Sequence, residues 1–281
     1  MSTPTPATFD FADRRALIFG GAKGIGRAVA LEFARRGADV AIADIDQRAA
    51  EDTAQAILAM GRRAVALSCD VCIDDSVRDA AMAAETALGA LDIVVNNVGA
   101  ILMGNPEDIP LEEWQRIFNL NFFSAVRSND YFLPKMLQRG SGYIVNTASF
   151  AGLYPYAANR MPYVAAKAAL IALTESLALY LLPKGIHVSC FCPGPVRTDV
   201  MLSMKNWSKN VAMRGPGSQF ELLTADEAAV ILADGMASQR IVIPSHEKVW
   251  DNLREHACSP DQFIKAQIAR FDAGDAGLPT R

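Results

Sequence analysis

The sequence predicts an α/β fold built on a doubly wound parallel sheet, and three observations support that prediction. Short apolar runs alternate with helical patterns over residues 15–200. The apolar runs are continuous, as in strands that helices cover on both faces. A glycine-rich turn stands directly between the first apolar run and the first helix. Right-handed crossovers between such strands place helices on both faces of one sheet.

We expect these elements to follow one another in regular order along a single domain of residues 1–281. The predicted strands cover residues 16–19, 40–43, 64–67, 91–95, 143–146, 187–191 and 241–243. The predicted helices cover about 24–36, 46–61, 74–88, 112–137 and 163–182, with a polar helical tail at about 247–271. Gly37 ends the first helix and Asp46 caps the second.

The segment of about residues 199–220 differs from the rest of the chain. It is polar, contains methionine and glycine, and has no clear helical or strand period. We expect it to form a lid over a binding site. A surface insertion without a role in binding is the alternative.

Composition excludes several classes of function. The net charge of −4 gives no electrostatic basis for binding nucleic acid or anionic membrane. No apolar run reaches the roughly 18 residues of a membrane span, and the N-terminus does not resemble a secretion signal. Cys69 and Cys72 have the spacing of a redox motif, but a buried free thiol at the end of a strand is favoured, and a zinc site would need a second suitably spaced pair. The five cysteines therefore indicate a reduced, cytoplasmic protein. His187, His246 and His256 form no metal-binding pattern with them, so we expect no metal.

The strongest chemical signal is Tyr163 with Lys167 four residues later and Ser149 fourteen residues earlier. The spacing places Tyr163 and Lys167 on one face of a helix. An ammonium beside a phenol favours the phenolate, so we expect Lys167 to lower the pKa of Tyr163 and make it a general acid and base. The alternatives are a packing tyrosine, a solvated lysine and a serine that caps the end of a strand.

The turn at Gly20–Gly26 indicates a phosphate-binding loop. Glycine lets the backbone approach a pyrophosphate, and the helix N-terminus that follows offers N–H groups and a positive dipole end. Gly20, Gly24 and Gly26 are spaced four and two residues apart, unlike the usual dinucleotide fingerprint. A plain tight turn is the alternative.

Asp44 follows the second predicted strand and favours NAD over NADP. A carboxylate at this place can bind both hydroxyls of the adenosine ribose. It would repel a 2′-phosphate and leave that phosphate without a cationic partner. Lys23 argues the other way, because a base beside the loop could hold the phosphate. We give Asp44 more weight, since it contacts the ribose directly.

With these motifs in order, the chain resembles the short-chain dehydrogenase/reductase family of single Rossmann domains, over roughly residues 15–200. The motifs that carry the resemblance are Gly20–Gly26, Asp44, Asp70–Val71, Asn96–Gly99, Asn121, Ser149, Tyr163, Lys167 and Pro193–Thr198. Phe19 stands where the family usually has threonine, and Val98 where it has alanine. The C-terminal tail departs from the family pattern, which leaves the usual tetramer contact in doubt.

The resemblance implies a role for each catalytic residue. Tyr163 is the general acid and base, and Lys167 lowers its pKa and binds the nicotinamide ribose. Ser149 donates a hydrogen bond to the substrate oxygen. Asn121 holds a water that links Lys167 to solvent, with Asn119 as a nearby rival for this role.

The resemblance also implies a set of NAD contacts, in which Val196 and Thr198 hold the nicotinamide carboxamide. The full predicted set is Gly20, Lys23, Gly24, Ile25, Gly26, Asp44, Ile45, Asp70, Val71, Asn97, Gly99, Thr147, Tyr163, Lys167, Pro193, Gly194, Val196 and Thr198.

The implied reaction is hydride transfer between NAD(H) and a secondary alcohol or ketone. Ser149 and Tyr163 would contact the substrate together with Tyr154 and Tyr156. Further lining residues are expected at Leu153, Met161, Met201, Met204, Trp207 and Met213. These apolar, adaptable side chains suit a bulky hydrophobic substrate, including a steroid-like one. Packing within the lid is the alternative for half of them. Arg160 and Arg197 could meet an acidic group, but we expect both to be solvated.

Two other functions stay open. One is reduction of 3-oxoacyl thioesters with NADPH, against which Asp44 argues. The other is a dinucleotide sensor without turnover, which would not need Ser149, Tyr163 and Lys167. The long apolar helices are expected to pair with copies of themselves in a homodimer or homotetramer.

Overall fold

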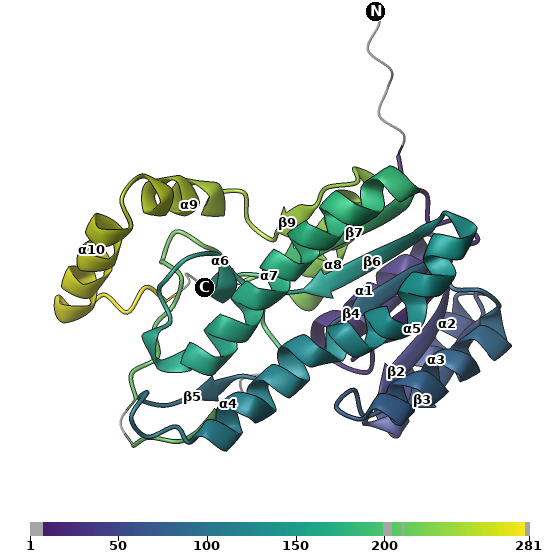
Figure 1. Ribbon diagram of the computed structural model, residues 1–281, viewed down its shortest axis with the longest axis horizontal. Helices are drawn as coiled ribbons and strands as arrows, with labels where there is room; N and C mark the ends of the chain where they lie inside the picture. The colour runs from purple at the N-terminus through teal and green to yellow at the C-terminus, as the bar shows by residue number, and fades with distance from the viewer. Residues whose placement is uncertain (1–7, 199–203, 210, 279–281) are drawn as a thin grey trace, which may run out of the picture.

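A central sheet of seven strands runs through the computed structural model, which describes residues 8–198, 204–209 and 211–278 (Figure 1). In spatial order the strands are β3 (Ala64–Ser68), β2 (Asp39–Asp44), β1 (Arg15–Phe19), β4 (Ile93–Asn96), β6 (Gly142–Thr147), β7 (Ile186–Cys192) and β9 (Val242–Pro244). Every neighbouring pair is parallel. The first three strands lie side by side from β1 at the centre to β3 at one edge. The fourth strand, β4, then pairs with the other side of β1, and β6, β7 and β9 follow towards the opposite edge. The predicted doubly wound α/β fold is confirmed.

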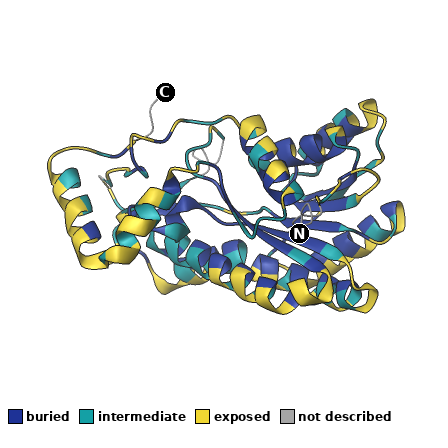
Figure 2. Cartoon of the chain, turned by 90° about the horizontal axis from the view of Figure 1, so that it is seen from above, coloured by how far each residue is buried: buried dark blue, intermediate teal, exposed yellow. Residues whose placement is uncertain are grey.

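Helices cover both faces of this sheet. One face packs against α1 (Gly24–Arg35), α2 (Gln47–Ala59) and α8 (Ala225–Ala237). The other packs against α3 (Asp74–Leu88), α5 (Ser124–Arg139) and α7 (Met161–Leu181). Figure 2 shows the buried residues gathered on the strands and on the inner sides of these helices. Helix α8 was not among the predicted helices, although a capping box of Thr224 and Glu227 marks its start.

The predicted helix 112–137 is interrupted. It consists of α4 (Leu111–Phe118), a π-helical turn η1 (Asn119–Phe123) and α5. The outer limits are close to those predicted, but the π-helical turn changes the face that the following residues present. Such turns occur often at functional sites, and this one carries Asn121.

Part of the predicted lid forms a second, two-stranded sheet. Strand β8 (Lys205–Asn206) pairs in parallel with β5 (Leu102–Met103). Within the same segment Phe220 is completely buried in the core. Residues 199–203 and 210 of the lid prediction, including Met201, lie outside the described residues. Three short helices also occur, namely α6 (Phe150–Leu153), η2 (Ala158–Arg160) and η3 (Leu182–Lys184).

The C-terminal tail forms two helices, α9 (Val249–Cys258) and α10 (Pro260–Asp272), which are separated at Ser259. Figure 1 shows them beyond the carboxyl ends of the strands. The chain then returns to the 211–220 segment, where the N–H groups of Gly215 and Gly217 donate to the carbonyls of Ala276 and Gly277, each at 2.8 Å. The tail is thus joined by backbone hydrogen bonds to the segment predicted as a lid.

Helix α7 is more apolar than the sequence analysis allowed. The segment Ala158–Lys184 has a mean hydropathy of 1.6 in its most apolar window, so by length and composition it could span a membrane. In the described structure it instead packs along β7 and α6, and it buries Lys167. These contacts are those of a core helix of the sheet fold.

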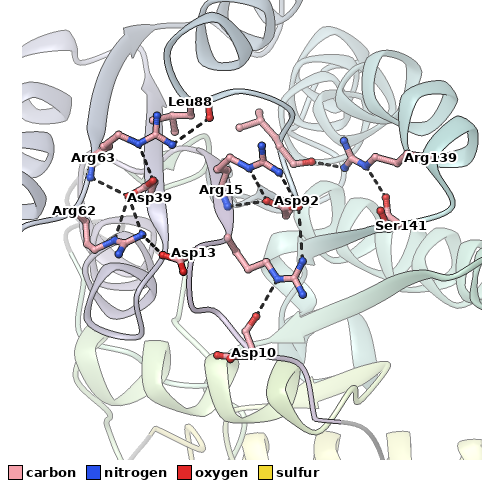
Figure 3. A network of polar contacts seen from close by, with 12 residues as sticks. Asp10, Asp13, Arg15, Asp39, Arg62, Arg63, Leu88, Asp92, Arg139 and Ser141 are labelled. Atoms are coloured by element: carbon pink, nitrogen blue, oxygen red, sulfur yellow. Dashed lines mark hydrogen bonds and ion pairs between the residues drawn. The ribbon is translucent and has the colours of Figure 1, made fainter.

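Ion pairs to partly or fully buried carboxylates connect the amino-terminal ends of the strands (Figure 3). Asp39 at the start of β2 accepts hydrogen bonds from the Arg63 backbone N–H at 2.9 Å and from Arg63 Nε at 2.8 Å. Arg62 Nε donates to the same carboxylate at 3.1 Å. Burial alone would raise the pKa of Asp39, but the hydrogen bonds from Arg63 and the charges of both arginines lower it.

We expect Asp39→Asn to lower the free energy of unfolding at pH 7 by about 1–3 kcal/mol, because charged hydrogen bonds are lost in a buried place. A lowered folded-state pKa means that this stabilisation is present above the unfolded pKa of about 3.9 and is lost as pH falls through the folded value. The difference between wild type and variant should therefore narrow below about pH 4, as measured by urea unfolding.

Asp13→Asn is the matched control for this prediction. Asp13 is 91% exposed in its side chain and reaches Arg62 at 3.3 Å. Its backbone is left-handed, with φ +56°, a conformation that asparagine tolerates. We expect a change under about 0.5 kcal/mol. Equal effects of the two substitutions would contradict the assignment of the stabilisation to Asp39.

Candidate active site

The predicted site residues gather where the parallel strands end. Gly20 follows β1, Asn97 follows β4, Ser149 lies just after β6 and Pro193 follows β7. Asn97 Nδ2 donates to the Gly20 carbonyl at 3.1 Å and joins the ends of β1 and β4. This is the crevice at which the strand order reverses, the usual binding place in doubly wound sheets.

The glycine turn has the shape that a pyrophosphate needs. Gly20 has φ +76°, and a Cβ atom there would lie 2.8 Å from Val98 Cγ2. A Cβ atom at Gly26 would overlap the Gly20 carbonyl oxygen. The absence of side chains therefore brings the start of α1 close to the end of β1. The backbone N–H groups and the helix dipole at this place fit a phosphate group.

Asp44 is held beside this turn by backbone hydrogen bonds. Its two carboxylate oxygens accept from the N–H groups of Ala22 and Asp46, each at 3.0 Å. Lys23 pairs with Asp46 at 2.5 Å, so its charge is countered within the chain. The next residue, Ile45, is 74% exposed.

A chain of hydrogen bonds between buried side chains connects the sheet to α7. Asn96 Nδ2 donates to Asn146 Oδ1 at 2.9 Å, and Asn146 Nδ2 donates to Thr174 Oγ1 at 3.0 Å. The Thr174 hydroxyl in turn donates to the Leu170 carbonyl at 2.7 Å. Since α7 carries both Tyr163 and Lys167, this series helps to place them against β4 and β6.

Lys167 is almost completely buried, with 3% exposure. Its ammonium donates to the Thr147 carbonyl at 2.7 Å. Burial lowers the pKa of Lys167 to about 8. A Cβ atom at Gly99 would lie 3.2 Å from Lys167 Nζ and 2.8 Å from Asn121 Oδ1, so the lysine and the asparagine meet at this glycine.

Asn121 offers a buried acceptor at the same point. Its Nδ2 donates to the carbonyls of Ala100 and Ile117 at 3.1 and 3.0 Å. Within the described part of the chain, its Oδ1 is buried and has no hydrogen-bond partner. An orphaned acceptor beside an ammonium is suited to hold a water. Asn119 instead accepts from Arg127 at 2.7 Å, so the geometry favours Asn121 over its rival.

Tyr163 is half-buried, and its environment differs from the one predicted. Burial raises the pKa of its phenol, while a hydrogen bond with Ser149 and the charge of Arg160 oppose the rise. The Lys167 ammonium lies 5.8 Å from the centre of the Tyr163 ring and hydrogen-bonds to Thr147. The prediction that Lys167 lowers this pKa is therefore wrong for this structure, in which burial outweighs the nearby charges.

Ser149 acts as a cap, which was the alternative to its predicted contact with the substrate oxygen, and that contact stays a prediction. This serine is the N-cap of α6, where its hydroxyl accepts from the Ala151 N–H at 3.2 Å, and it also reaches the phenol of Tyr163. Thr147, two residues earlier, has a buried hydroxyl without a hydrogen-bond partner among the described residues. Its place beside Lys167 suits the predicted cofactor contact.

The 193–198 segment returns from the end of β7 to the glycine turn. A Cβ atom at Gly24 would lie 3.6 Å from Thr198, and Val196 forms a parallel bridge with Leu223. The Gly194 N–H donates to Ser245 Oγ at 2.8 Å, and this hydroxyl also bonds to His246 Nδ1 at 2.8 Å. Ser245 was missed by sequence reasoning, because no spacing relates it to this segment.

The predicted adenine contacts follow β3 at the same edge of the sheet. Asp70 Oδ1 accepts from the Cys72 N–H at 2.9 Å, and the Asp70 N–H donates to Ser76 Oγ at 3.0 Å. Val71 is buried in the core with 5% exposure. Elsewhere in the described ranges, no group of three His, Cys, Asp or Glu side chains is placed to hold a metal ion.

Aromatic side chains form one wall, here called the aromatic wall, where the sequence predicted substrate contacts. The rings of Tyr154 and Tyr156 are 5.2 Å apart, and Phe263 of α10 meets Tyr154 edge-on at 6.1 Å. The Tyr154 hydroxyl donates to the Pro216 carbonyl at 2.9 Å, so its own chain already uses this polar group. Burial raises the pKa of Tyr156 to about 12, which keeps its phenol protonated.

The methionines and tryptophan of the lid prediction are less enclosed. Trp207 and Met213 are exposed, while Met204 is half-buried. Lys205 Nζ lies 4.1 Å from the Trp207 ring and also pairs with Glu113 at 2.9 Å. These contacts anchor residues 204–209 to α4.

Comparison with known proteins gives one consistent result. A model of the short chain dehydrogenase family matches residues 14–209. Cyclohexanol dehydrogenase of Acinetobacter sp. (strain SE19) is 34% identical over 192 residues, which are 68% of this chain and 76% of that protein. The 1-deoxy-11-beta-hydroxypentalenate dehydrogenase of Streptomyces exfoliatus is 31% identical over 245 residues, 86% of each chain.

A solved structure shows the same arrangement in three dimensions. It is a short chain dehydrogenase/reductase from Burkholderia phymatum in complex with NAD. The TM-score is 0.79 at 26% sequence identity, and the match covers 90% of this chain and 96% of that one.

The geometry predicts that Asn121→Ala and Asn119→Ala have different effects on turnover. Loss of the buried Asn121 acceptor beside Lys167 should lower kcat at least about tenfold, because a group that supports proton transfer is removed. Asn119→Ala removes one hydrogen bond to Arg127 and should change kcat less than about threefold. Steady-state kinetics with thermal unfolding as the folding control would measure both. A larger loss in Asn119→Ala would contradict the assignment.

Proposed function

Because this chain belongs to the short-chain dehydrogenase family of oxidoreductases, we propose that it transfers a hydride between NAD(H) and a secondary alcohol or ketone. The observation that carries the proposal is the meeting of Tyr163, Ser149 and Lys167 beside the glycine turn. In this proposal Tyr163 is the proton donor, Ser149 the hydrogen-bond donor and the glycine turn the phosphate-binding loop, at the strand ends where the strand order reverses.

A bound nicotinamide cofactor supplies or accepts the hydride. Tyr163 gives a proton to the substrate oxygen in ketone reduction and takes it back in alcohol oxidation. The raised pKa of Tyr163 keeps the phenol protonated near pH 7, which is the form needed for reduction. Ser149 donates a hydrogen bond to the same oxygen, where negative charge develops. Lys167 and Asn121 hold the polar path that leads away from Tyr163.

The proposal includes the predicted cofactor contacts. The glycine turn would hold the pyrophosphate, and Lys167 would hold the nicotinamide ribose. Val196 and Thr198 would lie at the carboxamide, and Asp70 and Val71 near the adenine. Asp44 supports NAD rather than NADP, since its carboxylate is fixed beside the turn by the N–H groups of Ala22 and Asp46. The pairing of Lys23 with Asp46 weakens the argument for a 2′-phosphate at Lys23.

The substrate is proposed to be bulky and largely hydrophobic. The aromatic wall of Tyr154 and Tyr156 supports this, as do the names of the cyclohexanol and hydroxypentalenate dehydrogenases. Reduction of 3-oxoacyl thioesters with NADPH is less well supported, because Asp44 opposes NADPH. A sensor without turnover would have no use for the arrangement of Ser149, Tyr163 and Lys167.

Assembly as a homodimer or homotetramer is part of the proposal. The outer sides of α4, η1 and α7 expose apolar side chains, including Leu111, Phe123 and Leu179. A hollow of about 450 Å³ lies on the same side, lined by Trp114, Gln115, Phe118, Asn119 and Phe123. A second copy would cover these surfaces. We also propose a cytoplasmic location, which the five free cysteines support.

The proposed mechanism predicts that Tyr163→Phe lowers kcat for cyclohexanone reduction by at least about 100-fold, because the proton donor is removed. The Kd for NADH, measured by tryptophan fluorescence, should stay within about threefold. Tyr143→Phe is the control, since it removes a buried hydroxyl that bonds to Ser189 at 2.8 Å, away from the site. Near-normal turnover in Tyr163→Phe would refute the mechanism.

The cofactor assignment predicts at least about 100-fold higher kcat/KM with NADH than with NADPH, because like-charge contact with Asp44 costs several kcal/mol. Asp44→Ser should reduce this ratio at least about tenfold, whereas Asp52→Ser, at an exposed carboxylate of α2, should leave it unchanged. Initial rates at saturating ketone measure the ratio. A wild-type preference for NADPH would overturn the assignment to NAD.

A further inference from the structure

Arg160 occupies a place that the sequence analysis did not expect. It ends η2, directly before α7, three residues ahead of Tyr163. Its side chain is half-buried, whereas Arg197 is exposed as expected. The guanidinium carbon lies 5.5 Å from the centre of the Tyr156 ring, and Nη2 donates to the Arg214 carbonyl at 2.7 Å.

The charge of Arg160 has no acidic partner in the described part of the chain. Other half-buried arginines there pair with carboxylates, as Arg36 does with Glu32 at 2.7 Å. Among the described half-buried arginines, only Arg160 and Arg214 have no carboxylate within 4.0 Å. The Arg214 guanidinium lies 4.5 Å from the Phe271 ring centre, which leaves Arg160 as the charged group next to the aromatic wall.

Arg160 is also close to the reacting end of the site. Burial raises the pKa values of Tyr156 and Tyr163, and in both cases the positive charge of Arg160 opposes the rise. Arg160 lies against the Tyr156 ring and three residues ahead of Tyr163, so its charge stands on the Tyr156 side of the predicted site.

We propose that Arg160 binds a carboxylate of the substrate, so that the natural substrate is a hydrophobic hydroxy acid or oxo acid. This inference rests on the proposed function and names its substrate class. A guanidinium carries five N–H donors in a planar fork that matches a carboxylate. In the described chain these donors meet the Arg214 carbonyl and the neighbouring Tyr156, and no carboxylate. A carboxylate would provide the missing opposite charge in a partly dehydrated place, where the attraction is stronger than in water.

The reaction itself leaves the carboxylate unchanged. In the reductive direction the carbonyl carbon gains a hydride from reduced nicotinamide, and its oxygen gains a proton from Tyr163. Arg160 acts only on binding and orientation, at a distance from the reacting carbon. Its loss should therefore weaken binding of acids and spare neutral ligands of the same shape.

The test compares cyclohexanecarboxylate with cyclohexanecarboxamide, which share one ring and differ in charge. Binding of each to the NADH-loaded enzyme is measured by calorimetry. We expect wild type to bind the carboxylate at least about tenfold more tightly, and Arg160→Gln to abolish this preference. Arg160→Lys keeps the positive charge but loses the planar pair of N–H donors. This variant should retain part of the preference for the carboxylate over the carboxamide. Thermal unfolding checks that each variant is folded.

Arg214→Gln is the matched control, because it removes a neighbouring half-buried guanidinium that rests on Phe271. It should keep the preference within about threefold. Equal binding of the two ligands by wild type would overturn the proposal, and so would equal losses in Arg160→Gln and Arg214→Gln. Oxidation of cyclohexanol and of 4-hydroxycyclohexanecarboxylate with NAD separates the two levels of inference. Turnover without a carboxylate preference refutes only the role of Arg160, whereas a preference without turnover refutes the oxidoreductase proposal.

Discussion

The hydrogen-bonded series from Asn96 through Asn146 to Thr174 is the interaction on which the geometry of the site depends. It runs through the interior from β4 to β6 and on to α7, and each buried amide finds a partner. An amide left unpaired there would cost about 1–3 kcal/mol, so a slip of α7 along the sheet is opposed. Because Tyr163 and Lys167 stand on α7, their position relative to the strand ends follows from this series.

Burial is the largest cause of the pKa shifts of Tyr163 and Lys167. It raises the pKa of Tyr163 and lowers that of Lys167, so both groups are shifted towards their neutral forms. The Lys167 ammonium is hydrogen-bonded to the Thr147 carbonyl and not to the phenol. Arg160 is the cation that acts on the phenol from the substrate side.

The C-terminal extension contributes to the same wall from far along the chain. Phe263 of α10 packs against Tyr154, and the backbone of residues 276–277 holds Gly215 and Gly217. Close approach at this point requires glycine, since a Cβ atom at Gly215 would overlap the Gly277 carbonyl oxygen. The Arg160 hydrogen bond to the Arg214 carbonyl lies directly beside this junction. The substrate end is therefore built by three segments that no local motif connects.

The sequence by itself determined the strands, most helices and the motif residues, because these depend on local patterns. Continuous apolar runs identify buried strands, Asp46 caps α2 as predicted, and the family motifs place Gly20–Gly26 after β1 and Tyr163 in the helix that follows β6 and α6. Tertiary structure alone decided the π-helical turn at Asn121, the pairing of β5 with β8, the raised pKa of Tyr163 and the half-buried Arg160. Each of these arises from contacts between distant segments, and burial and unmatched charge have no signature in the spacing of neighbouring residues.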